Sequence, residues 1–438
     1  MHWEKLLSAD RFGKETMKPV ASEFARTEFQ RDFDRLIFSS PFRRLQNKTQ
    51  VFPLPGSVFV HNRLTHSLEV ASVGRSLGNL VSQKLIEKGE KSLLISEIGS
   101  IVAAACLSHD LGNPPFGHAG EKAISDYFLK GEGAKYQATI SENEWQDLLN
   151  FEGNANALRL LTHTFNGRRY GGFVLTYATL ASLIKYPYSS INRTKKNKYG
   201  YFKSEEETFQ KIAKKTELVQ IDSVYARHPL VYLVEAADDI SYQIMDIEDA
   251  HKLNILSTDR TVFLLTSFFD EKEDSWFYEK KAKVFAEVTD KNEQIAFLRA
   301  SLINLLVNKT SAIFTKNEAK ILEGKFTGSL VDYLEGASAT ALRNCKDTAF
   351  KEIYNHRSVI EIEITGYNVL NTLLSEYIRA FFDPKAEYSK KLLTLLPLQY
   401  QEQHSNNYEK LRSVIDFISG MTDLYALDLY KLIKGIGI

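Results

Sequence analysis

Apolar positions recur along this chain at the spacing of helices rather than strands. Between residues 65 and 88 they form one continuous helical face, and Asn62 or Thr65 can cap its start. Comparable spacing predicts further helices over 19–50, 93–110, 118–129, 145–164, 176–185 and 228–251. Helices of this kind bury one side and expose the other, as in a soluble helical protein.

The pattern stays helical between residue 253 and residue 438. It is clearest over 300–306, 329–334, 368–381 and 411–432. Residues 359–365 alternate between apolar and polar side chains as a strand would, but a helical pattern surrounds them. The sequence therefore predicts a mostly α fold.

The charge and the cysteine content argue against a highly charged nucleic-acid-binding protein and against a disulfide-rich secreted protein. The 438 residues contain 55 Lys and Arg against 55 Asp and Glu, so no net charge recruits nucleic acid or a membrane. Two cysteines are too few for a disulfide framework. Neither a signal peptide nor a run of roughly 18 apolar residues is found in the sequence. We therefore expect a soluble, cytoplasmic protein without a membrane partner.

The stretch 101–121 carries the strongest chemical signal. An Ala-rich apolar run ends in two adjacent metal-competent side chains, His109 and Asp110, and a Gly- and Pro-rich turn then stops the helix. A second helix begins near His118, which puts His118 and Glu121 on one face. Burying such a polar cluster is costly unless something compensates it, and a metal ion is the simplest explanation.

The helix expected over 228–251 carries a second polar row. Asp238, Tyr242 and Asp246 follow one another at intervals of four, which aligns them along one helix face. No Lys or Arg occurs between Arg227 and Lys252, so these side chains do not form the ion pairs of a surface helix. Together, His66, His109, Asp110 and Asp238 offer two imidazoles and two carboxylates. Such a set suits Mn, Fe, Co, Ni or Zn, and less typically Mg, with positions left for water and a phosphate oxygen.

These residues resemble a known family. The order of His66, His109-Asp110 and Asp238 is similar to the HD-domain superfamily of metal-dependent phosphohydrolases, and more closely to its deoxyguanosinetriphosphate triphosphohydrolase (dGTPase) family. The motifs that carry the resemblance are Phe42-Arg-Arg-Leu-Gln-Asn-Lys-Thr-Gln-Val-Phe52, Asn62-Arg-Leu-Thr-His-Ser-Leu68, His109-Asp-Leu-Gly-Asn-Pro-Pro-Phe-Gly-His-Ala-Gly-Glu121 and Phe151-Glu-Gly-Asn-Ala155. The resemblance implies an HD-domain helical bundle within residues 1–255, with a basic excursion at 188–207. A C-terminal helical extension, 256–438, would pack on this core.

The resemblance also implies a reaction. A dNTP, with dGTP preferred, and water would give a deoxynucleoside and inorganic triphosphate. The cofactor would be a divalent ion, Mn first, with Mg, Co, Ni, Fe or Zn as alternatives. His118 and Glu121 would act as a dyad, in which Glu121 orients the imidazole and His118 handles the proton. Mammalian relatives have His-Glu where this chain has Phe151-Glu152, so a third catalytic histidine is absent from the sequence.

Substrate contacts follow from the same resemblance. Arg63 and Lys185 would bind phosphate oxygens, although Lys185 also fits a helix-end lysine, and Lys198 is a further candidate in the basic excursion. Tyr242 would pack on the deoxyribose. Gln46 and Asp246 would hydrogen-bond the 3′-OH. Candidates for contacts to the base are Arg357, Glu361 and Glu363.

Relatives of this kind form hexamers or tetramers, so a homo-oligomer is expected. Single-stranded DNA or a dNTP would serve as effector, with the Arg-rich segment 26–48 and residues 193–198 as candidate sites. A solvated charged face explains these segments equally well. Two other functions remain open: an HD phosphohydrolase acting on nucleoside monophosphates or cyclic nucleotides, and a binding protein or sensor that has kept the fold.

Overall fold

The computed structural model describes residues 1–15, 26–52, 60–193, 197–401 and 404–437. These residues are mostly helical, and their paired strands, β1 (Gln220–Ile221) and β2 (Val224–Tyr225), form one short antiparallel hairpin. The mostly α prediction is confirmed. None of the described helices combines the length and the apolar character needed to cross a membrane.

The helices up to the middle of the chain are α1 (Trp3–Leu6), α2 (Glu28–Ile37), α3 (Ser40–Arg44), η1 (Leu45–Asn47), α4 (Arg63–Glu87), η2 (Leu93–Glu97), α5 (Ile98–Ser108), α6 (Gly117–Leu129), η3 (Glu132–Thr139), α7 (Glu142–Leu149), α8 (Gly153–Thr162), α9 (Tyr177–Leu183), η4 (Ser190–Asn192), η5 (Lys203–Glu205), α10 (Glu206–Lys215) and α11 (Val231–Lys252). They are followed by α12 (Thr258–Thr266), α13 (Ser275–Glu287), α14 (Lys291–Leu322), η6 (Leu330–Tyr333), α15 (Gly336–Thr348), the π-helical turn η7 (Ala349–Ile353), α16 (Arg357–Phe382), α17 (Glu387–Thr394), η8 (Leu398–Tyr400), α18 (Asn407–Ser419) and α19 (Asp423–Lys434).

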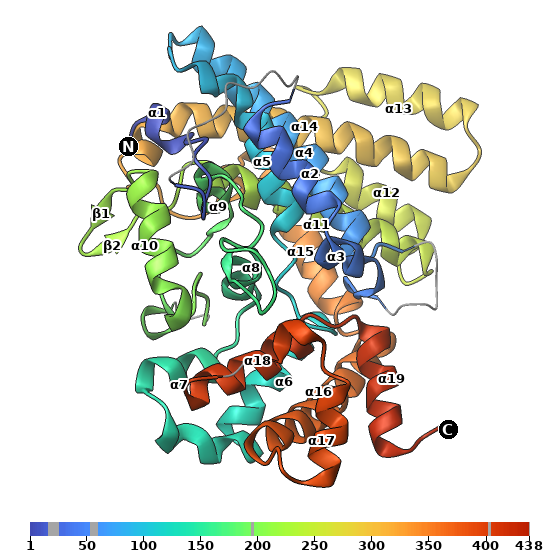
Figure 1. Cartoon of the computed structure of the whole chain (residues 1–438). Helices are drawn as coiled ribbons and strands as arrows, with labels where there is room; N and C mark the ends of the chain where they lie inside the picture. The colour runs from blue at the N-terminus through green and yellow to red at the C-terminus, as the bar shows by residue number, and fades with distance from the viewer. Residues whose placement is uncertain (16–25, 53–59, 194–196, 402–403, 438) are drawn as a thin grey trace.

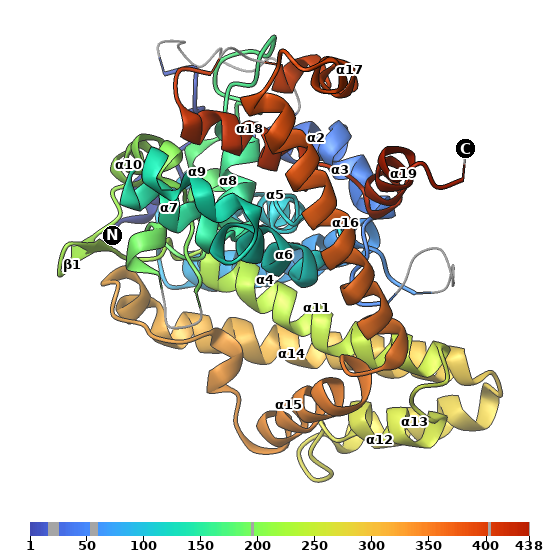
Figure 2. The ribbon, with the colours of Figure 1, turned by 90° about the horizontal axis from the view of Figure 1, so that it is seen from below.

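Two hydrophobic cores divide the molecule into two groups of helices. One group gathers α2, α4, α5, α9, α11, α12, α13 and α14, which form the upper part of Figure 1. The other gathers α6, α7 and the C-terminal helices α16 to α19, which form the lower part. The view from below shows α16 crossing beside α6 and reaching past α11 (Figure 2). The functional cavity described below is lined by residues of both groups.

Small residues bring α4 and α5 unusually close together. A Cβ atom at Gly78 would lie 2.7 Å from the Cα of Gly99, and one at Gly74 would lie 2.6 Å from the Sγ of Cys106. Gly74, Gly78 and Gly99 permit this contact, because a Cβ atom at any of these positions would meet the facing helix and separate the two helices. Their close packing fixes the relative positions of the first turn of α4 and the C-terminal end of α5.

Three predicted elements differ in detail. The helix expected over 19–50 divides into α2 and α3, because Ser39 caps a new helix that has Pro41 in its first turn; residues 16–25 lie outside the described chain. The helix expected over 145–164 breaks before Gly153, where the Glu152 side chain accepts a hydrogen bond from the Asn154 amide. The alternating stretch 359–365 lies inside α16, so it is helical.

Candidate functional site

A cavity of about 630 Å³ lies between the two groups of helices. Its walls come from the first turn of α4, the turn between α5 and α6, the middle of α11 and the N-terminal half of α16. This volume falls in the range of small-molecule sites. His66, His109, Asp110, His118, Glu121 and Asp238, the metal and dyad residues expected from the sequence, all line it.

Three of these side chains form a candidate metal centre. His66, His109 and Asp238 each offer one donor atom, and these atoms lie within 4.8 Å of one another. Asp238 Oδ1 is 3.1 Å from His66 Nε2 and 3.5 Å from His109 Nε2. The three residues come from α4, the end of α5 and α11, so the packing of these helices assembles the group.

The chemistry of this donor set fits a divalent ion. His109 Nδ1 donates to the carbonyl oxygen of Cys106 at 2.6 Å, which leaves Nε2 free of that proton and directed at Asp238. Burial disfavours the charged form of Asp238, but His109 and His66 outweigh it and hold the pKa of Asp238 well below its usual value. A carboxylate with two imidazole nitrogens is a donor set that Mn, Fe, Co, Ni and Zn all accept.

Asp110 lies beside this group rather than within it. Its Oδ2 accepts a hydrogen bond from Arg63 Nη1 at 2.8 Å, and its Oδ1 accepts one from Nδ2 of the Asn113 side chain. Its Oδ1 also lies 3.7 Å from His109 Nε2. The structure thus brings all four expected ligands together, with Asp110 engaged by Arg63.

His118 and Glu121 are paired as the sequence predicts. His118 Nδ1 lies 2.9 Å from Glu121 Oε2, and Glu121 Oε1 accepts a hydrogen bond from the Gly153 amide at 2.8 Å. The bond to Glu121 raises the pKa of His118. Burial opposes the charge on Glu121, but His118 and Lys198 lower the pKa of this carboxyl. The His118 side chain itself is 83% exposed, so the dyad presents an accessible imidazole at the cavity.

Basic side chains line one part of the cavity. Lys185 Nζ pairs with Glu235 at 3.1 Å, and Lys198 Nζ pairs with Glu152 at 2.8 Å. Arg63, Lys185 and Lys198 are all lining residues. Both lysine candidates of the sequence therefore lie at the cavity, each held by a carboxylate.

An aromatic pair closes another part of the cavity. The rings of Tyr242 and Tyr354 stack with centroids 6.2 Å apart, and Tyr354 Oη donates to Asp246 Oδ2 at 2.7 Å. Burial raises the pKa of Asp246 to about 7. Both tyrosines are among the lining residues of the described chain, whereas Asp246 lies behind them. Tyr354 lies in a segment without a recognisable motif, so no signal in the sequence indicates its place at the cavity.

The structure places Gln46 away from the cavity. Gln46 is exposed within η1 and is not among the described residues that line the cavity. Gln50 lines it instead, and its Oε1 is buried without a hydrogen-bond partner in the described part of the chain. Gln46 follows Leu45, whose side chain is buried, so the η1 turn directs the glutamine outward. Both glutamines belong to the same motif, and helical spacing alone does not show which one faces inward.

The three candidates for contacts to the base differ in their position relative to the cavity. Glu363 lines the cavity, together with Val359 and Ile362 of the same helix. Arg357 and Glu361 pair with each other at 2.7 Å, with side chains 89% and 60% exposed, and neither is among the described lining residues. Of the three candidates, the structure brings Glu363 to the cavity.

Comparison with known proteins now identifies the family. Residues 63–170 match the HD domain, and residues 334–432 match the phosphohydrolase-associated domain. A deoxyguanosinetriphosphate triphosphohydrolase-like protein of Synechocystis sp. is 38% identical over the full length of both chains. The chain belongs to the dGTPase family of HD-domain phosphohydrolases.

Further members of the dGTPase family are similar to the chain over nearly its whole length. A deoxyguanosinetriphosphate triphosphohydrolase-like protein of Pseudomonas aeruginosa is 37% identical over 99% of both chains. A deoxyguanosinetriphosphate triphosphohydrolase of Salmonella arizonae is 32% identical over 93% of this chain and 94% of its own length. The protein is therefore a hydrolase. HD-domain phosphohydrolases depend on a metal ion, in keeping with the His66, His109 and Asp238 donors.

Proposed function

We propose that the protein hydrolyses dNTPs, with dGTP preferred, to a deoxynucleoside and inorganic triphosphate in the cytoplasm. The observation that carries the proposal is the His118–Glu121 dyad in the same cavity as the His66, His109 and Asp238 donors. The name of the Salmonella relative, deoxyguanosinetriphosphate triphosphohydrolase, supports dGTP as the substrate.

His66, His109 and Asp238 would hold the divalent ion, Mn in the first instance, with Asp110 as the fourth ligand. Such an ion, when bound, supplies positive charge that polarises a phosphate oxygen and acidifies water. Glu121, fixed by the Gly153 amide, orients His118 through its Nδ1. The remaining nitrogen of His118, Nε2, is then the atom that exchanges a proton with water or the leaving oxygen.

Substrate binding is assigned to the polar walls of the cavity. Arg63, Lys185 and Lys198 would bind the triphosphate, because each lines the cavity with a cationic group. Tyr242 and Tyr354 would pack on the deoxyribose. The buried Gln50 Oε1 has no partner in the described chain, so we assign the 3′-OH contact to Gln50 in place of Gln46, together with Asp246.

The assay that tests the reaction separates products of the four dNTPs and of GTP by chromatography after addition of Mn. We expect triphosphate and deoxyguanosine from dGTP at the highest rate, and little turnover of GTP. Release of pyrophosphate or phosphate would contradict the proposal. Turnover of nucleoside monophosphates or cyclic nucleotides in place of dNTPs would establish the alternative phosphohydrolase.

His118→Ala tests the proposed proton transfer. We expect turnover to fall by about 10²- to 10⁴-fold, the usual contribution of general acid–base catalysis, with bound metal unchanged. His2→Ala, at an exposed position near the N-terminus, is the control and should retain full activity. Equal activity of the two variants would remove His118 from the mechanism.

The proposal extends to assembly. The core would comprise residues 1–255 with the extension 256–438 packed on it, and the protein would form a hexamer or tetramer. Light scattering measures this state directly, and a strict monomer would contradict it. Addition of single-stranded DNA or a second dNTP to the activity assay tests the expected effectors.

A further inference from the structure

The carboxylate of Asp423 joins two separate walls of the cavity from outside it. Asp423 is the first residue of α19 and is buried. Its Oδ2 accepts a hydrogen bond from the Thr49 amide at 2.8 Å, and its Oδ1 accepts one from the Phe116 amide at 3.0 Å. Thr422 caps α19 through its own side chain, so the Asp423 carboxylate is not needed as the cap and bonds to segments far away in the sequence.

Both amides are close in sequence to residues of the proposed mechanism. Thr49 precedes Gln50, and Phe116 stands two residues before His118. Thr49, Gln50, Phe116 and His118 all line the cavity. One carboxylate therefore sets the separation between the Gln50 wall and the His118–Glu121 wall.

The turn that leads into His118 has an unusual backbone. Phe116 has φ 62 and Gly117 has φ 57, and Phe116 is one of the few described non-glycine residues in the left-handed region. A side chain such as Phe persists there only when its surroundings impose the conformation. Asp423 supplies one restraint through the Phe116 amide, and α16 supplies another, because a Cβ atom at Gly366 would lie 2.5 Å from Phe116 Cγ.

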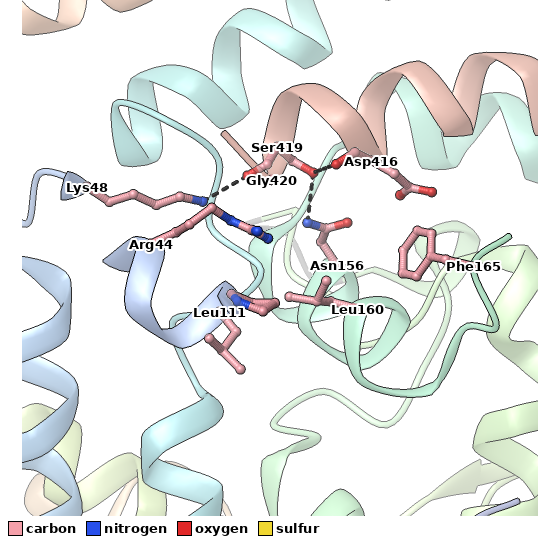
Figure 3. A pocket seen from close by; sticks show the side chains of 10 residues that line it. Arg44, Lys48, Leu111, Asn156, Leu160, Phe165, Asp416, Ser419 and Gly420 are labelled. Atoms are coloured by element: carbon pink, nitrogen blue, oxygen red, sulfur yellow. Dashed lines mark hydrogen bonds between the residues drawn. The ribbon is translucent and has the colours of Figure 1, made fainter. Parts of the chain in front are cut away.

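A second link runs in parallel. Lys48 Nζ is buried and donates to the carbonyl oxygen of Asn113. It also donates to the carbonyl oxygen of Ser419 at 2.8 Å (Figure 3). Asn113 in turn donates to Asp110. The end of α18 is thus linked through Lys48 to the middle of the turn that joins the metal donors to the dyad, and the start of α19 bonds to its last residue, Phe116.

We propose that Asp423 is a positioning residue, through which the C-terminal helices hold His118 and Gln50 at their working separation. This inference rests on the proposed function, since the work of both residues is defined by it. Displacements of about 1 Å in an active site reduce rates by about 100-fold. An asparagine in place of Asp423 could accept a hydrogen bond from one of the two backbone amides. Its own side-chain N–H groups would then face the other amide, which is also a donor.

Asp423→Asn is compared with Asp428→Asn, an exposed carboxylate on the same helix. We expect kcat for triphosphate release to fall by about 100-fold in Asp423→Asn, with unchanged bound Mn, and to stay at the wild-type value in Asp428→Asn. In the His118→Ala background, Asp423→Asn should cause little further loss, because both changes remove the same contribution. An additive further loss, or full activity of Asp423→Asn, would overturn the proposal.

Gly366→Ala provides a variant that leaves the carboxylate intact. Alanine strengthens the helix itself, but its Cβ displaces Phe116, so kcat should fall even though the gain in helix propensity offsets part of the cost of overpacking. The NMR signal of the His118 ring, identified by its absence in His118→Ala, should shift in Asp423→Asn and Gly366→Ala but not in Asp428→Asn. This readout needs no turnover: an inactive wild type would refute the proposed function, and an unmoved His118 signal would refute the role of Asp423.

Discussion

A histidine outside the cavity makes the stability of the fold depend on pH. His228 is buried; its Nδ1 accepts a hydrogen bond from the Leu230 amide at 3.2 Å, and its Nε2 donates to the Leu6 carbonyl at 3.1 Å. Burial lowers the pKa of His228 to about 4. The ring is therefore neutral in the folded protein over the range in which an unfolded histidine takes up a proton.

The sign of the effect follows from proton uptake. Between pH 6.5 and pH 4 the unfolded chain binds a proton at His228 and the folded chain does not, so acid favours unfolding. We expect this group to remove about 3 kcal/mol of the free energy of unfolding as pH falls through that window. Urea unfolding of wild type and His228→Gln at both pH values measures it. A constant difference between the two proteins would contradict the assignment.

Gln50 and Gln46 provide a matched pair of substitutions. Gln50→Ala should lower kcat/KM for dGTP by about 5- to 150-fold, because it removes a hydrogen-bonding group from the cavity and leaves its partner on the substrate unpaired. Gln46→Ala changes an exposed side chain and should leave both constants unchanged. Steady-state kinetics of the two variants decide between them, and loss of activity in Gln46→Ala alone would restore the first expectation.

The sequence indicated contacts between side chains that are close to one another along the chain. The pair His118 and Glu121 depends on one helical turn, which spacing predicts. The place of Gln50 at the cavity and the contacts of Tyr354 with Tyr242 and Asp246 depend on how separate segments pack, and spacing within a motif carries no information about that packing. The dGTPase resemblance supplied the motif of Gln50 but not the inward direction of its side chain.

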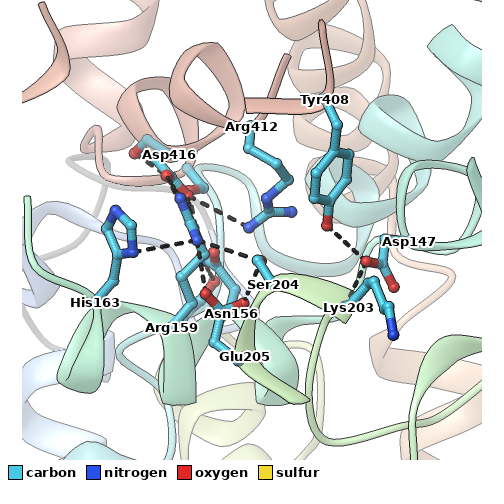
Figure 4. A network of polar contacts seen from close by, with 12 residues as sticks. Asp147, Asn156, Arg159, His163, Lys203, Ser204, Glu205, Tyr408, Arg412 and Asp416 are labelled. Atoms are coloured by element: carbon cyan, nitrogen blue, oxygen red, sulfur yellow. Dashed lines mark hydrogen bonds and ion pairs between the residues drawn. The ribbon is translucent and has the colours of Figure 1, made fainter. Parts of the chain in front are cut away.

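Among whole elements, α8 and α18 are joined by a buried ion network (Figure 4). Arg159 binds Asp416 through two parallel hydrogen bonds, Nε to Oδ1 at 2.9 Å and Nη2 to Oδ2 at 2.7 Å. Its Nη1 reaches Glu205 of η5 at 2.6 Å. Arg412 adds a contact from its Nη2 to Asp416 at 3.3 Å. The network holds the C-terminal helices against the HD domain.

Asp416→Asn should lower the free energy of unfolding by about 3–5 kcal/mol, because it leaves buried guanidinium groups with too little negative charge. Glu361→Gln removes half of the exposed pair with Arg357 and should change stability by less than about 1 kcal/mol. Denaturant unfolding compares the two. Equal stability of both variants would show that the buried network carries no net energy.

The positions of most helices could be predicted because apolar spacing is a local property. The breaks within 19–50 and 145–164 were missed because each depends on a short cap, at Ser39 and Glu152, inside an otherwise helical pattern. The stretch 359–365 alternates because α16 is partly exposed there: Ile360 and Ile364 face solvent, whereas Val359 is buried.

At the scale of the whole molecule, metal binding should stabilise the fold. Three helices contribute His66, His109 and Asp238, so unfolding separates the donors. An ion at 100 times its dissociation constant then adds about 2.7 kcal/mol to the free energy of unfolding. Thermal unfolding of chelator-treated protein with and without Mn measures this shift. His109→Ala should abolish it, and the same shift in that variant would place the ion elsewhere.

The role of the C-terminal region in the cavity could be predicted from the sequence only in part. Its helical character was evident, and Glu363 was among the candidates for contacts to the base, but Tyr354, which also lines the cavity, carries no local signature of a site. Contacts of this kind join residues hundreds of positions apart, and one chain without aligned relatives does not reveal them.

The bond between Thr49 and Asp423 has a consequence for biosynthesis. Its partners are 374 residues apart, so at the usual rates of translation about 20 to 75 s pass between the synthesis of one and the other. During that time the HD segment can form its helices, but the amides of Thr49 and Phe116 lack their hydrogen-bond acceptor, Asp423, until α19 has been synthesised. A nascent or C-terminally truncated chain would therefore hold metal donors without a finished cavity, and the nucleotide pool meets an active hydrolase only after synthesis is complete.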